Sequence, residues 1–208
     1  MLAVGEVAVT PELRHLELYT LRGLLTVLWH GRDAGRAVVA CGGAMGGLLG
    51  PAGRLYHELG EVLAGQGVAT LRVSYRRPND LDACCLDAAA AVQLAVGEGA
   101  ERVVVLGHSF GGAVAVRVAA ALPDPVCGVA TFATQSAGCE VADRLGDRPL
   151  LLFHGDRDEI LPVQASEVVR AIAGHGDLVV LPNDGHLLAK SGDVLLERLL
   201  EWLPGVLA

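Results

Sequence analysis

The sequence predicts an α/β fold with a mostly parallel central sheet and helices on both of its faces. From residue 36 onward, short runs rich in Val and Leu alternate with amphipathic or alanine-rich runs of helical length, a pattern typical of consecutive strand–helix–strand units. Hydrophobic residues make up 52% of the chain and charged residues 19%, which excludes a disordered chain. Because 208 residues are enough to enclose one sizeable core, we expect a single domain over residues 1–208.

The N-terminal part of the chain departs from this alternation. Residues 12–19 and 24–30 alternate polar and apolar side chains, as half-exposed strands do. Gly23 lies between the two runs and suits a tight connection. We therefore expect the sheet to begin with an antiparallel entry.

The other elements are expected to follow in regular order. The runs that predict strands are 36–41, 68–75, 103–106, 126–132, 150–154 and 178–181. The runs that predict helices are 51–66, a segment from Asp80 or Asp82 to about Val96, the alanine- and valine-rich segment after Gly112, a weakly helical stretch at 136–146, and then 163–173 and 191–203. Gly67 is placed to end the first helix, and either aspartate is a good N-cap for the second.

One junction between a strand and a helix carries a serine at its tip. The apolar run 103–106 feeds into Gly-His-Ser-Phe-Gly-Gly, which spans residues 107–112. A Gly-x-Ser-x-Gly turn between a strand and a helix is typical of a nucleophile elbow. Ser109 would be held in a strained backbone conformation there, so Gly107 and Gly111 must lack side chains that would collide. Gly112 would let the helix start close against the strand.

Carboxylates and a histidine follow two later strands. The strand at 150–154 leads into Asp156, Asp158 and Glu159, and the strand at 178–181 leads into Asp184 and His186. The carboxyl ends of parallel strands meet at one edge of a sheet, so these side chains should gather near Ser109. A serine, an acid and a histidine in this chain order indicate nucleophilic acyl transfer, in which the histidine takes the serine proton and the acid orients the histidine.

With these three motifs, the chain from residue 36 on resembles the α/β-hydrolase superfamily, as a small, lidless serine hydrolase similar to dienelactone hydrolases and carboxylesterases. The resemblance implies an α/β-hydrolase fold without a cap domain, Ser109 as nucleophile and His186 as its base. In the family pattern His-Gly-x-x-Asp-x-x-x-Pro, which begins here at His154, the orienting acid matches Asp158. Asp156 is kept as the reserve for that role and Asp184 is less favoured, while Glu159 is expected to point outward.

The resemblance also implies an oxyanion hole made of two backbone N–H groups. One is the N–H of Phe110, the residue after the serine. The second comes from the glycine-rich loop at 42–47, where matching the family's His-Gly motif selects Gly43 and leaves Ala44 open. The chain has Cys41-Gly42 in place of His-Gly. This departure removes a side chain that would brace the loop but no backbone donor.

The interval between the strands at 126–132 and 150–154 is too short for the cap that larger relatives insert there. The site should therefore be open and shallow, and suit esters or thioesters of modest size or acyl groups on a bulky carrier. Candidate apolar lining residues are Met45, Phe132 and Ile160, with Leu48, Leu49, Leu161 and Leu187 beside them. Arg76 and Arg77 are candidates for binding a substrate carboxylate, as arginines do in dienelactone-type hydrolases; the alternative is that they are solvated loop charges.

Other histidine and cysteine chemistry is disfavoured. His108 is expected to pack or hydrogen-bond locally and His154 to order the acid loop. The histidines expected to be solvated or structural are His15, His30, His57 and His175. A metal site at His154, Asp156 and His186 is disfavoured because the hydrolase pattern already accounts for these residues, and Cys41 lacks the turn that a nucleophile needs. No metal and no cofactor are expected.

Charge, apolar runs and cysteine content limit the kinds of partner and the compartment that we expect. The net charge of −8 and the lack of a basic stripe exclude nucleic acid as a partner. No apolar run is long enough to span a membrane, and no signal peptide is evident at the N-terminus. The five cysteines are an odd number without metal-type spacing, which indicates reduced thiols in a cytoplasmic protein. The oligomeric state is not predicted by any of these features.

The function predicted from these residues is hydrolysis of carboxylic esters or thioesters through an acyl-enzyme. A non-catalytic binding or interaction protein with the same fold is one alternative, although it would have no need of all three residues. A perhydrolase or an acyltransferase is the other alternative, since both use the same three residues.

Overall fold

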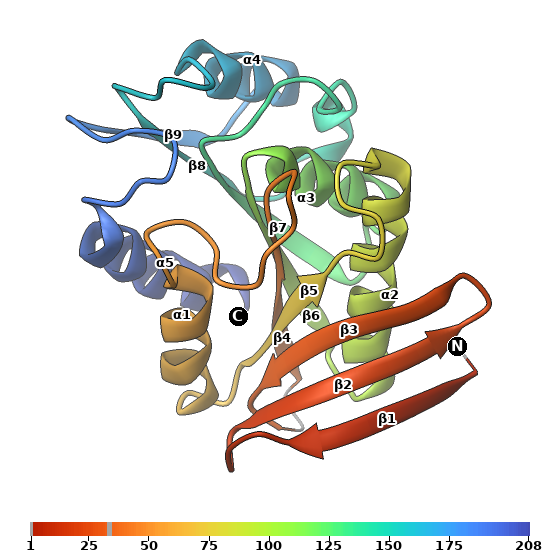
Figure 1. Cartoon of the computed structure of the whole chain (residues 1–208). Coiled ribbons are helices and arrows are strands. Elements are labelled where there is room, and N and C mark those ends of the chain that lie inside the picture. The colour runs from red at the N-terminus through yellow and green to blue at the C-terminus, as the bar shows by residue number, and fades with distance from the viewer. Residues whose placement is uncertain (1, 33–34) are drawn as a thin grey trace.

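The computed structural model describes residues 2–32 and 35–208 and is built on one nine-stranded sheet (Figure 1). The strands lie in the order β1-β2-β3-β5-β4-β6-β7-β8-β9. Their bounds are Ala3–Ala8 (β1), Leu13–Thr20 (β2), Gly23–His30 (β3), Arg36–Cys41 (β4), Ala69–Ser74 (β5), Arg102–His108 (β6), Val126–Phe132 (β7), Leu150–Gly155 (β8) and Asp177–Leu181 (β9). β1 pairs antiparallel with β2, β2 with β3, and β3 with β5, and all later pairs are parallel. The predicted fold class and the antiparallel entry are confirmed.

Helices cover both faces of the sheet. Their bounds are Leu55–Ala64 (α1), Leu81–Gly97 (α2), Phe110–Ala121 (α3), Gln164–Ala173 (α4) and Gly192–Val206 (α5), with a 3₁₀ turn at Ala142–Leu145 (η1). Side chains of α1 and α5 pack into the core on one face. Helices α2, α3 and α4 lie over the other face (Figure 1), and their side chains pack into the core there. The central strands β4 and β6 are buried on both faces, which is why the sequence shows them as continuous apolar runs.

The sheet register brings four loops to one edge. These are the loops that follow β4, β6, β8 and β9. The aligned pairs near the strand ends are Cys41↔Gly107, His108↔Phe132, Phe132↔Phe153 and Gly155↔Leu181. The glycine-rich loop, Ser109, Asp158 and His186 therefore start from neighbouring points on the sheet.

The edge strand β1 was not predicted. Its residues pair with β2 from Ala3↔Tyr19 to Ala8↔Arg14, but nearly all of them are exposed. A strand exposed on both faces has no alternation of apolar and polar residues, so nothing in its sequence marks it.

Two helices differ from their predicted bounds. The helix predicted from residue 51 begins only at Leu55, because Ala52 and Gly53 have positive φ angles that a right-handed helix does not allow. The last helix continues to Val206, beyond Pro204. Burial of Leu203 and Val206 in the core holds this final turn in place. Of the stretch predicted at 136–146, only η1 is helical.

Between β7 and β8 the chain forms only η1 and connecting turns, so no cap domain covers the carboxyl edge of the sheet.

The N-terminus of α2 is capped by Asp80 and not by Asp82, since the Asp80 side chain accepts a hydrogen bond of 3.0 Å from Ala83 N. None of the five cysteines forms a disulfide. Over residues 2–32 and 35–208 there is no helix of the length and apolarity that crossing a bilayer requires.

Candidate active site

Ser109 occupies the turn between β6 and α3. Its backbone angles, φ 56° and ψ −117°, lie in a region that residues with a side chain rarely adopt. Two hydrogen bonds fix this conformation: Ser109 N donates to Phe132 O at 2.8 Å, and Gly112 N donates to Ser109 O at 3.0 Å. The predicted strained turn is present, and it presents the hydroxyl at the carboxyl edge of the sheet.

The glycines around Ser109 are required by close backbone approaches. A Cβ at Gly107 would collide with the carbonyl of Gly111, and a Cβ at Gly111 would lie 2.6 Å from the carbonyl oxygen of Cys41. Gly111 therefore also lets the glycine-rich loop after β4 approach the elbow. Gly112 was predicted to let α3 start close against the elbow strand. It is required for another contact, because a Cβ there would collide with Thr134, just after β7.

Ser109, His186 and Asp158 form one hydrogen-bonded chain. His186 Nε2 lies 2.9 Å from Ser109 Oγ. On the other side of the ring, Nδ1 lies 2.8 Å from Asp158 Oδ2. The serine follows β6, the aspartate follows β8 and the histidine follows β9, so three separate strand ends supply the set.

The carboxylate of Asp158 is buried, and both of its oxygens have hydrogen-bond partners. Its Oδ1 accepts hydrogen bonds of 2.8 Å from both Ile160 N and Leu161 N. Its Oδ2 lies 3.2 Å from His154 Nε2 in addition to its contact with His186. Burial acts to raise the pKa of Asp158, but the hydrogen bonds from Leu161, His186 and Ile160 outweigh it and hold the pKa below its usual range. The group therefore stays a carboxylate at neutral pH.

The other two aspartates considered for this position have structural partners. Asp156 accepts a 2.6 Å hydrogen bond from Asn183 N and joins the loops after β8 and β9. Asp184 is buried and accepts hydrogen bonds from Ser191 Oγ at 2.6 Å and Lys190 N at 3.1 Å. Both therefore shape the loop that carries His186 and neither orients its ring.

Further side chains hold the two loops. His108 Nε2 lies 3.0 Å from the carbonyl oxygen of His186, and burial lowers the pKa of His108. His154 contacts Ser166 Oγ at 2.7 Å and Leu161 O at 2.9 Å, which orders the acid loop as predicted. Glu159 is exposed, but it does not simply point outward: its Oε2 lies 3.4 Å from His186 N.

The glycine-rich loop after β4 lies against Ser109. A Cβ at Gly43 would sit 3.9 Å from the Cβ of Ser109, and the loop is closed by a 2.9 Å hydrogen bond from Gly46 N to Gly43 O. Phe110 is the first residue of α3, so its N–H has no acceptor within the helix. Both predicted oxyanion residues thus border the serine, and their role stays a prediction.

Two tyrosines brace this loop, and the sequence did not point to them. Tyr56 OH donates to Cys41 O at 3.0 Å, and Tyr75 OH donates to Gly42 O at 3.2 Å. Both rings are buried. They take over the bracing that was expected to be missing with the family's histidine. The only signal in the sequence is their place, one on the apolar face of a helix and one at a strand end.

A cavity of about 540 Å³ opens beside Ser109. Its lining consists of residues 42–50, His108, Ser109, Ile160, His186 and Leu187. Met45 and Ile160 are among its lining residues, as predicted, but they lie at its exposed rim, with exposed fractions of 92% and 65%. Leu161 does not line it. Lys, Arg, Asp and Glu are absent from the lining, so the cavity presents apolar side chains and backbone to a substrate.

Two predicted substrate-binding residues lie elsewhere. Phe132 is fully buried and stacks on Phe153 with 5.4 Å between ring centroids, so the prediction that it lines the cavity is wrong. Arg76 lies outside the Ser109 cavity and forms an ion pair of 2.5 Å with the buried carboxylate of Asp87. Its predicted contact with a substrate carboxylate in this cavity is therefore also wrong. Arg77 pairs with Asp80 at 3.2 Å.

The structure also bears on two disfavoured kinds of site, a metal site and a cysteine nucleophile. Within residues 2–32 and 35–208, no group of three or more His, Cys, Asp and Glu side chains is arranged to hold a metal ion. Cys41 is fully buried, and burial raises the pKa of its thiol to about 12. A thiol of that kind is not a nucleophile at neutral pH.

The nine-stranded sheet and the strand-end loops define the fold of an α/β-hydrolase. The family model for phospholipases and carboxylesterases matches residues 87–191, about half of the chain, and this stretch contains Ser109, Asp158 and His186. The chain belongs to this family of hydrolases. No curated protein sequence matches it significantly.

Solved structures agree with this fold. Dienelactone hydrolase from Anabaena variabilis is 18% identical with a TM-score of 0.80, and the match covers 99% of each chain. The esterase Est1E from Butyrivibrio proteoclasticus is 18% identical with a TM-score of 0.79, covering 92% of this chain and 98% of its own. An esterase from Pyrococcus furiosus is 17% identical with a TM-score of 0.70, covering 95% and 92%.

Proposed function

We propose that the protein hydrolyses carboxylic esters or thioesters through an acyl-enzyme, with Ser109 as nucleophile, His186 as general base and Asp158 as the acid that orients it. The observation that carries this proposal is the continuous hydrogen-bonded chain from Ser109 Oγ through His186 to Asp158, with contacts of 2.9 and 2.8 Å. This chain ends at an open cavity, and its carboxylate is held ionised by the hydrogen bonds described above.

In the first half of the reaction, Ser109 Oγ attacks the carbonyl carbon of the substrate while its proton passes to His186 Nε2. The carbonyl oxygen becomes an oxyanion, which we expect the N–H groups of Phe110 and Gly43 to stabilise. Asp158 stabilises the imidazolium that forms. The bond to the leaving alcohol or thiol then breaks, and His186 returns the proton to that group.

In the second half, water replaces the leaving group. His186 takes a proton from the water as its oxygen attacks the acyl carbon, and the same two N–H groups again face the oxyanion. Collapse of this intermediate breaks the bond to Ser109 Oγ, and the serine regains its proton from His186. The products are a carboxylic acid and the free enzyme.

The cavity favours uncharged substrates. Its lining contains no Lys or Arg to pair with a substrate carboxylate, and its rim is formed by Met45, Leu49 and Ile160. The absence of a cap leaves room for a leaving group that extends into solvent. We therefore expect esters or thioesters with a neutral acyl group of modest size, on a small alcohol or on a bulkier carrier.

The proposal is tested by labelling and turnover. The wild-type protein should react with a fluorophosphonate probe at Ser109 and hydrolyse short-chain p-nitrophenyl esters and acyl thioesters, whereas Ser109→Ala and His186→Ala should do neither at a measurable rate. Ser136→Ala, at a half-buried serine outside the cavity, is the matched control and should keep both activities. Wild-type activity no higher than that of the two variants would overturn the proposal.

The alternatives have their own readouts. Transfer of the acyl group to an added alcohol or to hydrogen peroxide in preference to water would indicate an acyltransferase or a perhydrolase. A non-catalytic binding protein would show no labelling of Ser109 at all. The intact hydrogen-bonded set favours hydrolysis over that last alternative, because binding alone requires no activated serine.

A further inference from the structure

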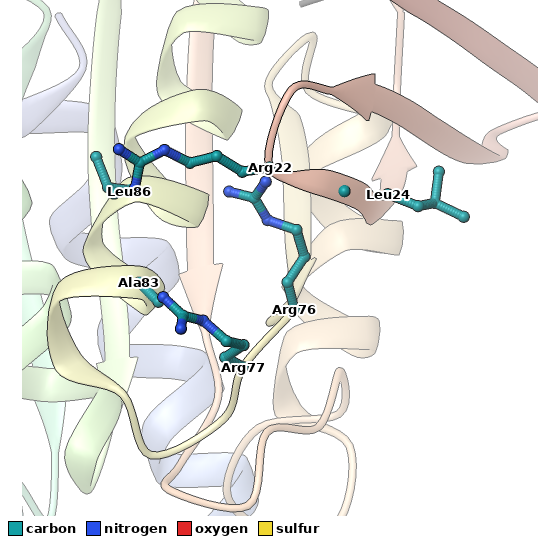
Figure 2. A pocket seen from close by; sticks show the side chains of 7 residues that line it. Arg22, Leu24, Arg76, Arg77, Ala83 and Leu86 are labelled. Atoms are coloured by element: carbon teal, nitrogen blue, oxygen red, sulfur yellow. The ribbon is translucent and has the colours of Figure 1, made fainter.

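A second cavity lies between the turn that joins β2 to β3 and the first turns of α2 (Figure 2). Its volume is about 350 Å³, and it shares no lining residue with the cavity beside Ser109. Of its seven lining residues three are arginines, Arg22, Arg76 and Arg77, and none is a carboxylate. Arg76 is paired with Asp87 and Arg77 with Asp80, so within the described residues Arg22 is the arginine of this cavity whose charge has no ion-pair partner.

Arg76, which lines this cavity, is held in a fixed position. Its Nε donates to Asp87 Oδ1 at 2.6 Å, its Nη2 contacts the same oxygen at 2.5 Å, and its Nη1 donates to Thr20 Oγ1 at 2.7 Å. A guanidinium carries five N–H donors. Two donors on the terminal nitrogens therefore remain for a ligand. The contacts with Asp87 and Thr20 already fix the orientation of the guanidinium, so less side-chain freedom is lost when a ligand binds.

Arg22 and Arg77 supply charge from two sides. Figure 2 shows Arg22 reaching from the β2–β3 turn across to α2 near Leu86, while Arg77 points toward Ala83. Within the described residues, Arg22 forms no ion pair. Arg77 pairs with Asp80 at 3.2 Å, but its side chain is 69% exposed, and an ion pair of such an exposed arginine contributes little. Asp80 would stay in place without it, because its other oxygen accepts from Ala83 N.

The remaining lining is apolar. Leu24 on β3 and Leu86 on α2 are each 44% exposed, and Ala83 on the first turn of α2 completes the apolar lining. Exposed leucines on both sides of an arginine cluster suit a ligand that combines an anionic group with an apolar body. Ser, Cys and His are absent from the lining, so the cavity offers binding without a nucleophile or a general base.

We propose that this cavity is a binding site for a small organic anion, a phosphate or carboxylate carried on an apolar group. Arg76 and Arg22 would contact the anion, because guanidinium groups match the geometry of two anionic oxygens. Arg77 would add a third contact on releasing Asp80. Leu24 and Leu86 would cover the apolar part.

The test is calorimetric titration at low ionic strength with phenyl phosphate and with benzoate, using benzyl alcohol as the uncharged probe. Ser109→Ala serves as the background, so that the result does not depend on the proposed reaction. We expect saturable binding of at least one anion with a Kd below about 1 mM, and none of the alcohol. The relative affinity for the two anions distinguishes a phosphate site from a carboxylate site.

Substitutions of the lining arginines test whether the anion binds in this cavity. Arg22→Gln together with Arg77→Gln should weaken anion binding by about tenfold or more, because two charge-assisted contacts are lost. Arg198→Gln, at an exposed arginine on α5, should leave it unchanged. In the protein with Ser109 intact, the double variant should hydrolyse neutral esters at the wild-type rate. No saturable anion binding, or equal binding by the double variant, would overturn the proposal.

Discussion

The carboxylate of Asp158 has no exposed surface, yet it lies 2.8 Å from Nδ1 of His186 and keeps its pKa below the usual range. Burial alone would favour the protonated acid. The N–H groups of Leu161 and Ile160, which donate to Oδ1, and the hydrogen bond of His186 to Oδ2 together reverse that preference. The acid loop therefore both selects Asp158 among its neighbours and keeps it charged.

This relationship predicts a large effect of Asp158→Asn. An amide cannot hold His186 in the tautomer that accepts the Ser109 proton, so kcat should fall by about 10⁴-fold while the fold stays intact. Asp156→Asn is the matched control, since the Asp156 side chain accepts from the backbone of Asn183 through an oxygen that an amide can retain. Steady-state kinetics of both variants with a p-nitrophenyl ester check the assignment, and a larger loss in Asp156→Asn would contradict it.

Tyr75→Phe should impair turnover more than substrate binding. The hydroxyl of Tyr75 donates to Gly42 O, so its removal leaves a buried carbonyl without this partner and loosens the loop beside Gly43. We expect kcat to fall by about tenfold, with little change in KM, because the oxyanion forms only after substrate has bound. Tyr19→Phe, at an exposed tyrosine bonded to Glu17, is the control and should behave as wild type.

Much of this arrangement could be predicted because it follows from local patterns. Strands buried on both faces appear as apolar runs, and β4 and β7 have the predicted bounds. The meeting of Ser109, a carboxylate and His186 was predicted from chain order, because the loops after parallel strands share one edge. The choice of Asp158 as that carboxylate came from the family pattern. The strand β1 was missed because exposure on both faces leaves no periodic signal.

The errors in the candidate site come from side-chain direction and from distant pairing. Phe132 ends a strand next to the site, but its ring points into the core against Phe153. Arg76 bonds to Thr20, 56 residues earlier in the chain, and local sequence contains no sign of that pairing. Tyr56 and Tyr75 were missed for the same reason, since what they brace is visible only in three dimensions.

Gly111→Ala should abolish activity and lower stability. A methyl group there would meet the carbonyls of Gly42 and Cys41, and neither backbone segment can move without displacing the loop from Ser109. We expect a loss of about 2 kcal/mol or more in the free energy of unfolding. Gly97→Ala, at a helix glycine with open space around it, should leave stability equal or slightly higher. Urea unfolding followed by circular dichroism compares the two.

His30 should make stability depend on pH in the acid range. The side chain is buried, neither ring nitrogen has a partner among the described residues, and burial with the nearby Arg72 and His57 lowers the pKa of His30 to about 4. Below pH 6.5 the unfolded chain takes up a proton at this residue that the folded protein does not. The lowered pKa of His30 therefore leaves the free energy of unfolding at its full value above pH 6.5. As the pH falls to about 4, the free energy of unfolding decreases by about 3 kcal/mol.

His30→Leu tests this assignment, since it removes the titrating group and keeps an apolar side chain of similar size. The free energy of unfolding of wild type relative to the variant should decline between pH 6.5 and 4 and stay constant above pH 7. A difference that does not change with pH would contradict a lowered pKa at His30.

The ion pair between Arg76 and Asp87 should be a structural requirement. Asp87 has no exposed surface and accepts both the guanidinium and the backbone N–H of Arg76, so Asp87→Asn leaves a half-buried positive charge without its partner. We expect the free energy of unfolding to fall by about 3–5 kcal/mol. Asp82→Asn is the control, because Asp82 is exposed and pairs with Arg117 at the surface, where such a pair contributes little. Urea denaturation of both variants measures the difference, and equal stabilities would show that the pair does not hold the β5–α2 connection in place.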